Sequence, residues 1–188
     1  IAAVARKIKP NIEIHLLDLN FEMLKNANKN SGSFSYGFWE NRVLEVIKNC
    51  KNPLIGISCM FDVNKETFVE ISQFIHDHFP GAPLIGGGVQ ATYDYKELLS
   101  EHGFNMVFRK ESEEQFSVFL ANLLLDNGSA KPCGVAFSYE GEIHTLGEPS
   151  GEVPVDIDIR DVYSLIPIED YYNYGGLAVF SRYNGKEK

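Results

Sequence analysis

The chain has 188 residues, of which 44% are hydrophobic and 23% are charged, so it contains enough apolar side chains for one sizeable buried core. Its 17 Lys and Arg residues against 26 Asp and Glu residues give a net charge of -9. This charge repels the phosphate backbone of nucleic acids and anionic lipid surfaces, so we expect neither nucleic acid nor membrane as a partner. The longest apolar run is too short to span a bilayer.

The cysteines indicate a reduced protein without a metal site. Cys50, Cys59 and Cys133 do not have the spacing of zinc or iron-sulfur ligands. An odd number of cysteines in an acidic chain without a secretory leader is typical of free thiols, which predicts a cytoplasmic location. Because the chain begins within a helix-like segment and without Met, we expect it to be part of a longer polypeptide.

Helices and strands alternate from the start of the chain. Residues 1–9 have helical composition, and the apolar residues of 12–17 predict a short strand. Residues 21–38 are rich in Asn, Ser, Gly and aromatic residues, which predicts one helical turn followed by a loop. Helical spacing resumes over 39–49, and the apolar run 53–58 predicts a buried strand.

The alternation continues through the middle of the chain. Asn64 is placed to cap a helix that Pro80 ends, and a strand over 82–85 then leads into three consecutive glycines. A short helix over 95–102 and a strand over 104–108 follow. The pattern therefore predicts a third helix-strand repeat.

The last predicted elements are a helix over 111–125, a hairpin over 132–146 with its turn at Glu140 and Gly141, and an irregular linker or arm over 147–188. Short strands joined by helices favour parallel neighbours linked by right-handed crossovers. The sequence therefore predicts a doubly wound, Rossmann-like α/β fold, with a mainly parallel sheet flanked by helices on both faces.

Doubly wound folds bind ligands beyond the carboxyl ends of their strands, so the residues that follow each predicted strand are the candidate site. Gly86, Gly87 and Gly88 would let a flat group or another backbone lie against one strand end, although a tight turn with positive φ is the alternative. Residues 86–91 also fit the dinucleotide pattern G-x-G-x-x-A. That match is weak, because the predicted helix starts late and the next strand ends in Arg109 rather than an acidic residue.

Three polar residues at strand ends have two interpretations each. Ser58 ends the most apolar strand, so its hydroxyl could bond the polar tail of a ligand or the local backbone. Asp18 could bond a ligand hydroxyl or cap the next segment, and Glu111 could serve a ligand or the start of a helix. Residues 56–60 lack the second glycine of the nucleophile motif G-x-S-x-G, so we expect no hydrolase and assign no catalytic acid, base or nucleophile.

The order of these elements resembles the cobalamin-binding domain of cobalamin-dependent radical S-adenosylmethionine enzymes. In that family a strand ending in Gly-x-Ser, here 56–58, is followed after one helix by a strand ending in Gly-Gly, here 84–88. Residues 109–116 resemble the family's Arg-Gly-Glu-Gly-Glu segment, and residues 132–142 resemble its Pro-Gly-Ile hairpin.

The resemblance implies a module that holds cobalamin with its nucleotide tail beside the sheet and its corrin ring over the strand ends. Ser58 would anchor the tail, the three glycines would give it clearance, and Met60 and Phe61 would form an apolar floor. Lys110 and Ser112 depart from the family, which has glycines there. The implied cofactor-binding residues are Asp18, Leu19, Asn20, Ser58, Met60, Phe61, Gly86, Gly87, Gly88, Val89, Gln90 and Glu111.

The resemblance also implies how the chain is divided. Residues 1–128 would form the cobalamin-binding domain, with a first strand before residue 1, residues 129–146 a hairpin extension, and residues 147–188 a linker to a catalytic radical domain of the same polypeptide. S-adenosylmethionine and a [4Fe-4S] cluster would belong to that absent domain, so the parent would be the methyltransferase or cyclase and this chain alone would not be catalytic. Two alternatives stay open: an interaction or regulatory domain with a decayed site, and a nicotinamide- or flavin-binding domain.

Overall fold

The computed structural model describes all residues except 31–34, 36, 126–130, 149–156 and 175–188. The chain divides into two compact units, each assembled from two separate stretches of sequence. The first unit comprises Ile1–Ile12 and Cys50–Asp158, and the second comprises Glu13–Asn49 and Ile159–Lys188. This division differs from the expected boundaries at residues 128 and 146.

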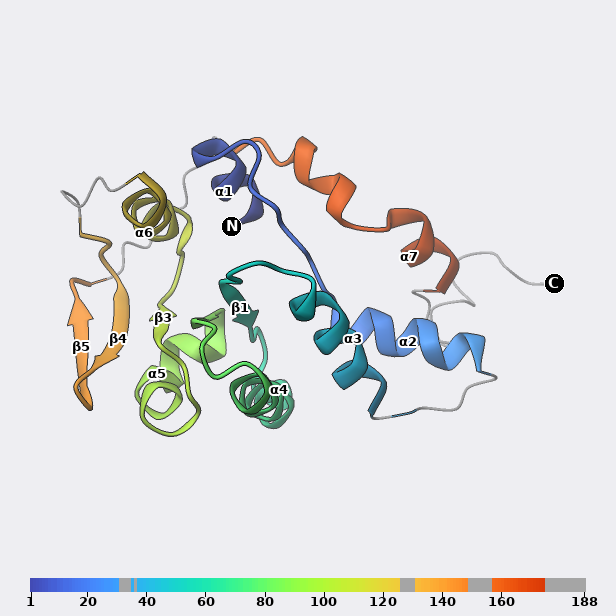
Figure 1. Cartoon of the computed structure of the whole chain (residues 1–188), viewed down its shortest axis with the longest axis horizontal. Coiled ribbons are helices and arrows are strands. Elements are labelled where there is room, and N and C mark those ends of the chain that lie inside the picture. Colours follow the sequence, from blue (N-terminus) through green and yellow to red (C-terminus); the bar gives the residue numbers. More distant parts are fainter. Residues whose placement is uncertain (31–34, 36, 126–130, 149–156, 175–188) are drawn as a thin grey trace. The chain divides into compact units, whose positions relative to one another are not determined.

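The first unit is built on a five-stranded sheet in the order β1-β2-β3-β4-β5 (Figure 1). The strands β1 (Ile55–Ser58), β2 (Leu84–Gly87) and β3 (Met106–Phe108) are parallel. The strands β4 (Val135–Tyr139) and β5 (Glu142–Leu146) form an antiparallel hairpin at the far side of β3. The sheet confirms the predicted α/β fold.

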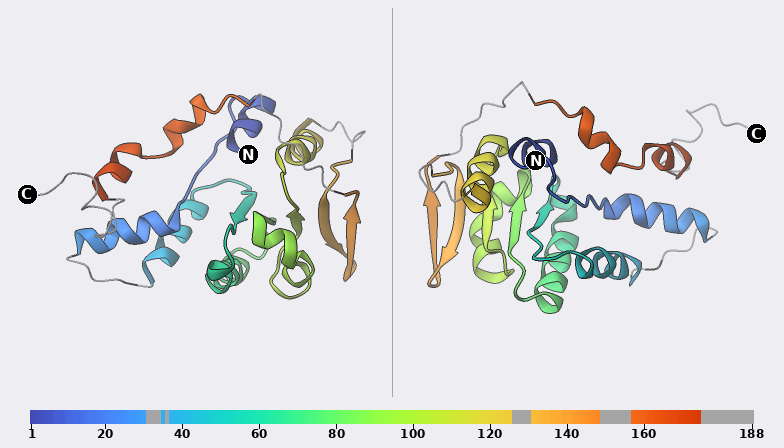
Figure 2. Two further views of the ribbon diagram at one scale, coloured as in Figure 1. Left: turned by 180° about the vertical axis from the view of Figure 1, so that it is seen from behind. Right: turned by 45° about the horizontal axis from the view of Figure 1, so that its top comes forward.

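The two-residue turn of the hairpin has the positive φ angles that a turn of this length requires. Glu140 has φ 51° and Gly141 has φ 81°, and a two-residue type I′ turn needs positive φ at both central positions. The views in Figure 2 show the hairpin at one edge of the sheet. It therefore belongs to the same sheet as β3 and is not an appendage.

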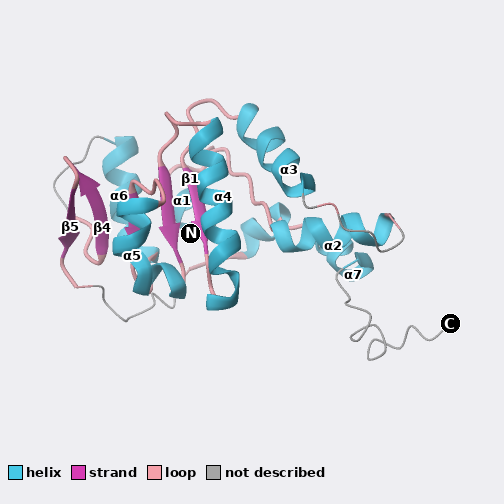
Figure 3. Cartoon of the chain, turned by 90° about the horizontal axis from the view of Figure 1, so that it is seen from below, coloured by secondary structure: helices cyan, strands magenta, loops and turns pink. Residues whose placement is uncertain are grey.

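Helices cover the two faces of this sheet. The helices α4 (Lys65–His78), which follows a short 3-10 turn η1 (Asp62–Asn64), and α5 (Val89–Glu101) connect the parallel strands and lie across one face (Figure 3). The helix α1 (Ala2–Ile8) packs on α6 (Glu113–Leu125) at the opposite face.

Aromatic contacts identify these faces. Phe68 of α4 stacks on Phe104 with ring centroids 5.2 Å apart, while Phe108 of β3 meets Phe116 of α6 at 5.7 Å. The buried core of this unit includes Ile71, Ile75, Leu84, Leu98, Phe104, Val107, Val135 and Ala136.

The second unit consists of helices. It contains α2 (Leu19–Lys29), α3 (Gly37–Lys48), the 3-10 segment η2 (Arg160–Leu165) and α7 (Ile168–Tyr174). The helix α7 lies on α2, where the ring of Tyr171 stacks on Phe21 at 3.8 Å between centroids and Lys25 pairs with Asp170. Part of the predicted irregular arm is therefore helical and packed.

The strand predicted over 12–17 is wrong. In the structure this segment has no ladder partner among the described strands and is assigned no regular secondary structure. An apolar alternation describes side chains only, and a strand also needs a neighbour whose backbone can complete its hydrogen bonds.

The prediction of one helical turn followed by a loop over 21–38 is wrong in its first half, where an 11-residue helix forms. The helix α2 begins at Leu19, because the Asp18 carboxylate accepts a hydrogen bond from the Phe21 N–H at 3.0 Å and so caps the first turn. Asn28 and Lys29 of this helix are exposed, while Lys25 pairs with Asp170 of α7.

Two predicted helix starts were misplaced. The helix α5 begins at Val89, six residues before the predicted start at 95, and α6 begins at Glu113 rather than Glu111. Asn64 precedes α4 as predicted, but its side chain makes no capping hydrogen bond. None of the helices in the described part of the chain is long and apolar enough to cross a membrane.

Candidate functional site

The carboxyl-terminal half of β1 and its neighbour on β2 form a strip of sheet that the described residues leave uncovered. Ser58 pairs in register with Gly87, and Gly56 lies two residues before Ser58, so all three face the same side of the sheet. Gly56 and Ser58 are exposed, and a Cβ built on Gly87 would have no heavy atom within 4 Å. We call Gly56, Ser58 and Gly87 the open strip. A ligand can lie directly on the sheet backbone here.

Ser58 was expected at a buried strand end, but the structure exposes it. Its hydroxyl therefore needs no protein partner, and it is accessible to a ligand. Gly56 lies on the same face of β1 as Ser58, although the sequence analysis did not include Gly56 among the site residues. The period-2 alternation of a strand was the available signal, because residues two apart share a face.

The three consecutive glycines have three different surroundings. A Cβ on Gly86 would lie 3.2 Å from the Phe104 ring on the covered face, and a Cβ on Gly88 would lie 2.4 Å from the Cys59 carbonyl oxygen. Gly88 also has φ 93°. Only Gly87 faces open space, so Gly86 and Gly88 are explained by packing and by a close backbone approach.

The ends of β1 and β2 are tied together through Cys59. Its N–H donates to the Gly87 carbonyl at 3.0 Å, and its carbonyl accepts from the Gln90 N–H at 3.1 Å. Burial raises the pKa of the Cys59 thiol above its ordinary value, and its Sγ lies 3.4 Å from the Phe61 carbonyl. Cys59 therefore fixes the site backbone and is not a reactive thiol.

Exposed apolar side chains lie at the same edge as the open strip. They are Met60, Phe61, Val63, Val89 and Tyr93, with exposed fractions of 54, 66, 87, 50 and 76%. We call these five residues the apolar patch. The first three follow β1, and the last two are one turn apart at the start of α5, so they share a helix face. Grouped exposed apolar side chains are typical of a binding surface, whereas isolated ones are ordinary.

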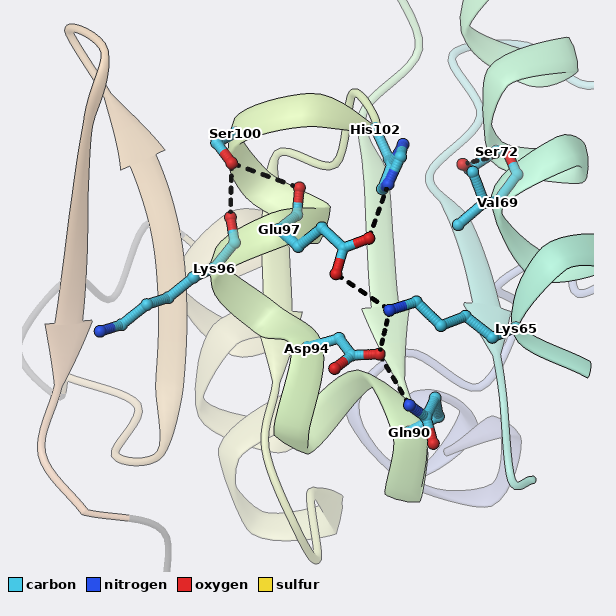
Figure 4. A network of polar contacts seen from close by, with 9 residues as sticks. All are labelled: Lys65, Val69, Ser72, Gln90, Asp94, Lys96, Glu97, Ser100 and His102. Carbon is cyan, nitrogen blue, oxygen red and sulfur yellow. Dashed lines mark hydrogen bonds and ion pairs between the residues drawn. The ribbon is translucent and has the colours of Figure 1, made fainter. Parts of the chain in front are cut away.

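A network of charged side chains joins α4 to α5 behind this edge (Figure 4). The Lys65 ammonium lies 2.9 Å from both the Asp94 and the Glu97 carboxylates, and Gln90 Nε2 donates to Asp94 Oδ2 at 2.7 Å. The hydrogen bond from Lys65 lowers the pKa of Asp94 below its ordinary value, and that from Gln90 lowers it further. The i to i+4 spacing from Gln90 to Asp94 was the signal that sequence reasoning missed.

The segment after β3 contains a lysine in the left-handed backbone region, where glycine is usually found. Lys110 has φ 57°, and its N–H donates to Thr92 Oγ1 at 2.8 Å. The side chain of Arg109 is buried over the Tyr95 ring, with its guanidinium carbon 5.1 Å from the centroid. Glu111 is exposed and precedes α6. A glycine at position 110 would adopt this backbone conformation without strain.

Replacing Lys110 by Gly should stabilise the protein. A side chain at φ 57° costs about 1–2 kcal/mol, and glycine avoids this cost but loses about 0.5–1 kcal/mol of chain entropy. We expect Lys110→Gly to raise the free energy of unfolding by about 0.5–1 kcal/mol in urea titrations. The control Lys51→Gly, at an exposed bend without positive φ, should give no gain, and an equal gain there would contradict the argument.

Asp18, Leu19 and Asn20 lie in the second unit, at the start of α2. The Asp18 carboxylate caps α2 and also accepts a hydrogen bond from the Tyr171 hydroxyl at 2.6 Å. Burial, with this hydrogen bond, raises the pKa of Tyr171 above its ordinary value. The capping interpretation of Asp18 is therefore the one that the structure supports.

The arrangement at the edge of the sheet is suited to binding rather than to acid-base or nucleophilic chemistry. No group of three or more His, Cys, Asp or Glu residues in the described ranges could hold a metal ion. The edge offers the hydroxyls of Ser58 and Tyr93, the side-chain amide of Gln90, glycine backbone and apolar side chains. Such a site can hold a large, flat, partly apolar ligand with a few polar groups.

The fold is an α/β sheet flanked by helices, with the candidate site at the carboxyl ends of its parallel strands. This fold is similar to that of part of the radical S-adenosylmethionine methyltransferase TsrM from Kitasatospora setae. A TsrM structure with cobalamin and a [4Fe-4S] cluster bound matches with a TM-score of 0.58 and 16% identity, over 81% of this chain and 26% of the TsrM chain. A second TsrM structure, with tryptophan substrate and a SAM analogue bound, matches with a TM-score of 0.58 over 78% of this chain and 27% of TsrM.

One curated relative is similar in sequence. Over 109 residues, the chain is 28% identical to the anaerobic magnesium-protoporphyrin IX monomethyl ester cyclase of Synechocystis sp. (strain ATCC 27184 / PCC 6803 / Kazusa). The match covers 56% of this chain and 21% of the cyclase, so the chain spans about a fifth of that relative. No protein-family model matches the sequence.

Proposed function

We propose that this chain is the cobalamin-binding module of a radical S-adenosylmethionine enzyme of the methyltransferase or cyclase type. In this proposal the nucleotide tail of the corrinoid lies along the open strip, where Gly56 and Gly87 give clearance and the Ser58 hydroxyl bonds the tail. The corrin ring lies over the apolar patch beside it. The observation that carries the proposal is the bare glycine-serine strip next to an exposed apolar patch at one strand edge.

The chemistry of the residues present fits such a ligand. A tail inserted beside the sheet needs small side chains, and the ring needs an apolar support, here Met60, Phe61 and Val89. When bound, cobalamin would supply methyl transfer or other cobalt chemistry, while the chain supplies position and a water-poor surface. S-adenosylmethionine and a [4Fe-4S] cluster belong, in this proposal, to a catalytic domain elsewhere in the same polypeptide.

The direct test is cofactor retention. The purified chain is incubated with hydroxocobalamin, free cofactor is removed by gel filtration, and the visible absorption spectrum is recorded. We expect corrinoid bands at close to one equivalent per chain. A colourless protein would contradict the proposal for this chain and would favour an interaction or regulatory domain with a decayed site.

A nicotinamide or flavin remains the second candidate ligand. It is favoured by the start of α5 at Val89, directly after the three glycines, because a dinucleotide fingerprint needs a helix there. The Gln90 N–H, however, already donates to the Cys59 carbonyl, so one donor of the first helical turn is not free for a pyrophosphate. A yellow protein as purified, or nicotinamide-dependent fluorescence, would support this candidate.

The outer edge of β1 fits a further strand before Ile1, which we include in the proposal. The Ile55 and Cys59 N–H groups bond to the β2 side, so in a parallel ladder the backbone groups of Gly56 and Ser58 point to the open edge. The sequence of β1, Ile-Gly-Ile-Ser, has no charge and no proline, the features that usually protect an edge strand.

Hydrogen exchange tests this further strand. In the present chain we expect the amides of Gly56 and Ser58 to exchange about 100-fold faster than those of Ile57 and Cys59, because they lack a ladder partner. In a chain extended by its upstream residues, all four amides should be protected. If Gly56 and Ser58 still exchange fast in the extended chain, no strand pairs at this edge.

A further inference from the structure

The side-chain amide of Gln90 has a fixed orientation. Gln90 is the second residue of α5, at the edge where β2 ends, and it is half-buried. An ionised carboxylate only accepts hydrogen bonds, so the group that Gln90 turns toward Asp94 must be its NH2. Figure 4 shows the carbonyl oxygen of Gln90 pointing away from Asp94.

Lys65 stabilises the ionised form of Asp94, and the orientation of the Gln90 amide depends on that form. Its ammonium lies 2.9 Å from Asp94 Oδ2, the same oxygen that accepts from Gln90 at 2.7 Å. The other contact of Lys65, to Glu97 at 2.9 Å, does not involve Gln90. Asp94 is 22% exposed at its side chain and Lys65 is 31% exposed, so solvent competes only partly with these contacts.

We infer that Gln90 is a specificity-determining residue, which offers its side-chain carbonyl to an amide N–H on the rim of the bound corrinoid. Asp94 and Lys65 are the positioning residues that keep the NH2 group turned inward. This inference rests on the proposed function. Cobalamin carries amide groups on its rim, and a carboxylate at the same position would offer no donor and would face a carbonyl oxygen.

The test compares cobalamin with derivatives in which one rim amide has been hydrolysed to a carboxylate, each regioisomer measured separately by spectroscopic titration. We expect the present chain to bind cobalamin about tenfold more tightly than at least one regioisomer, since one hydrogen bond to an uncharged group is worth about 0.5–1.5 kcal/mol. Asp94→Asn lets the Gln90 amide turn over, because Asn both donates and accepts. The preference should then fall to within a factor of about three.

The matched control is Glu97→Gln, which removes the negative charge of the second partner of Lys65 but leaves the bond between Gln90 and Asp94 in place. It should keep the full preference. An independent readout needs no ligand: the side-chain NH2 resonances of Gln90 in a 1H–15N spectrum should shift in Asp94→Asn and stay unchanged in Glu97→Gln.

The outcomes separate this inference from the proposed function. If the chain binds cobalamin but shows no preference among the rim derivatives, or if Asp94→Asn keeps the preference, the inference is overturned and the proposed function stands. If the chain binds no corrinoid at all, the proposed function fails, and the specificity role of Gln90 fails with it, whatever the resonances show.

Discussion

Replacing Ser58 by Trp should abolish cobalamin binding while the fold stays intact. Ser58 is exposed on the open strip, so the core does not have to move to admit a larger side chain. An indole ring covers about 150–250 Å² and would fill the space between Gly56 and Gly87 where the nucleotide tail is proposed to lie. We expect affinity for hydroxocobalamin to fall at least about 100-fold, or about 2.8 kcal/mol, in a spectroscopic titration.

Two further variants make this result interpretable. Ser138→Trp puts the same side chain at an exposed position of β4, away from the open strip, and should bind cobalamin normally. Ser58→Ala removes the hydroxyl and keeps the space, so it should cost about 0.5–1.5 kcal/mol, at most roughly tenfold. Unchanged binding in a folded Ser58→Trp variant would mean that the tail does not occupy the strip.

Replacing Gly88 by Ala should cause the largest loss of stability among single-methyl changes at the site. Its backbone, at φ 93° and ψ 176°, lies in a region that only glycine adopts readily, which costs other residues about 1–3 kcal/mol. The added Cβ would also lie 2.4 Å from the Cys59 carbonyl oxygen, a backbone atom that cannot move away alone. We expect the free energy of unfolding to fall by at least about 3 kcal/mol, a melting-temperature loss of about 6–12 °C.

Gly87→Ala is the matched control, one residue earlier. A Cβ on Gly87 has no heavy atom within 4 Å, and Gly87 has no positive φ. The melting temperature should change by less than about 2 °C, while cobalamin affinity should fall because the methyl group enters the open strip. Equal destabilisation by both substitutions would contradict the different roles of the two glycines.

Local patterns predicted most elements of the first unit. The apolar runs before Ser58 and Gly86, the helical spacing around Phe68, and the Glu140-Gly141 turn each describe side chains or dihedral angles that neighbours in sequence decide. The edge that carries the candidate site follows from the fold, because parallel strands joined by crossover helices bring their carboxyl ends together.

The misplaced elements depended on contacts that sequence neighbours do not make. The helix α2 depends on the Asp18 cap, and α7 packs on it through Tyr171 and Phe21. The segment 12–17 has the pattern of a strand but no described partner. A strand or a docked helix is defined by its neighbour, so pattern alone could not identify them.

Sequence pattern was enough for the α/β class, for the order of β1 to β5 along the chain, and for the residues that follow β1, β2 and β3. It was not enough for Asp18, Leu19 and Asn20, which were expected at a strand end and follow no described strand. Tertiary structure alone decided what each of those residues does. Gly86, Gly87 and Gly88 are identical in sequence, yet one faces a phenyl ring, one faces open space and one meets a carbonyl oxygen. The physical reason is that clearance, hydrogen-bond direction and exposure depend on distances between segments far apart in the chain, which only packing sets.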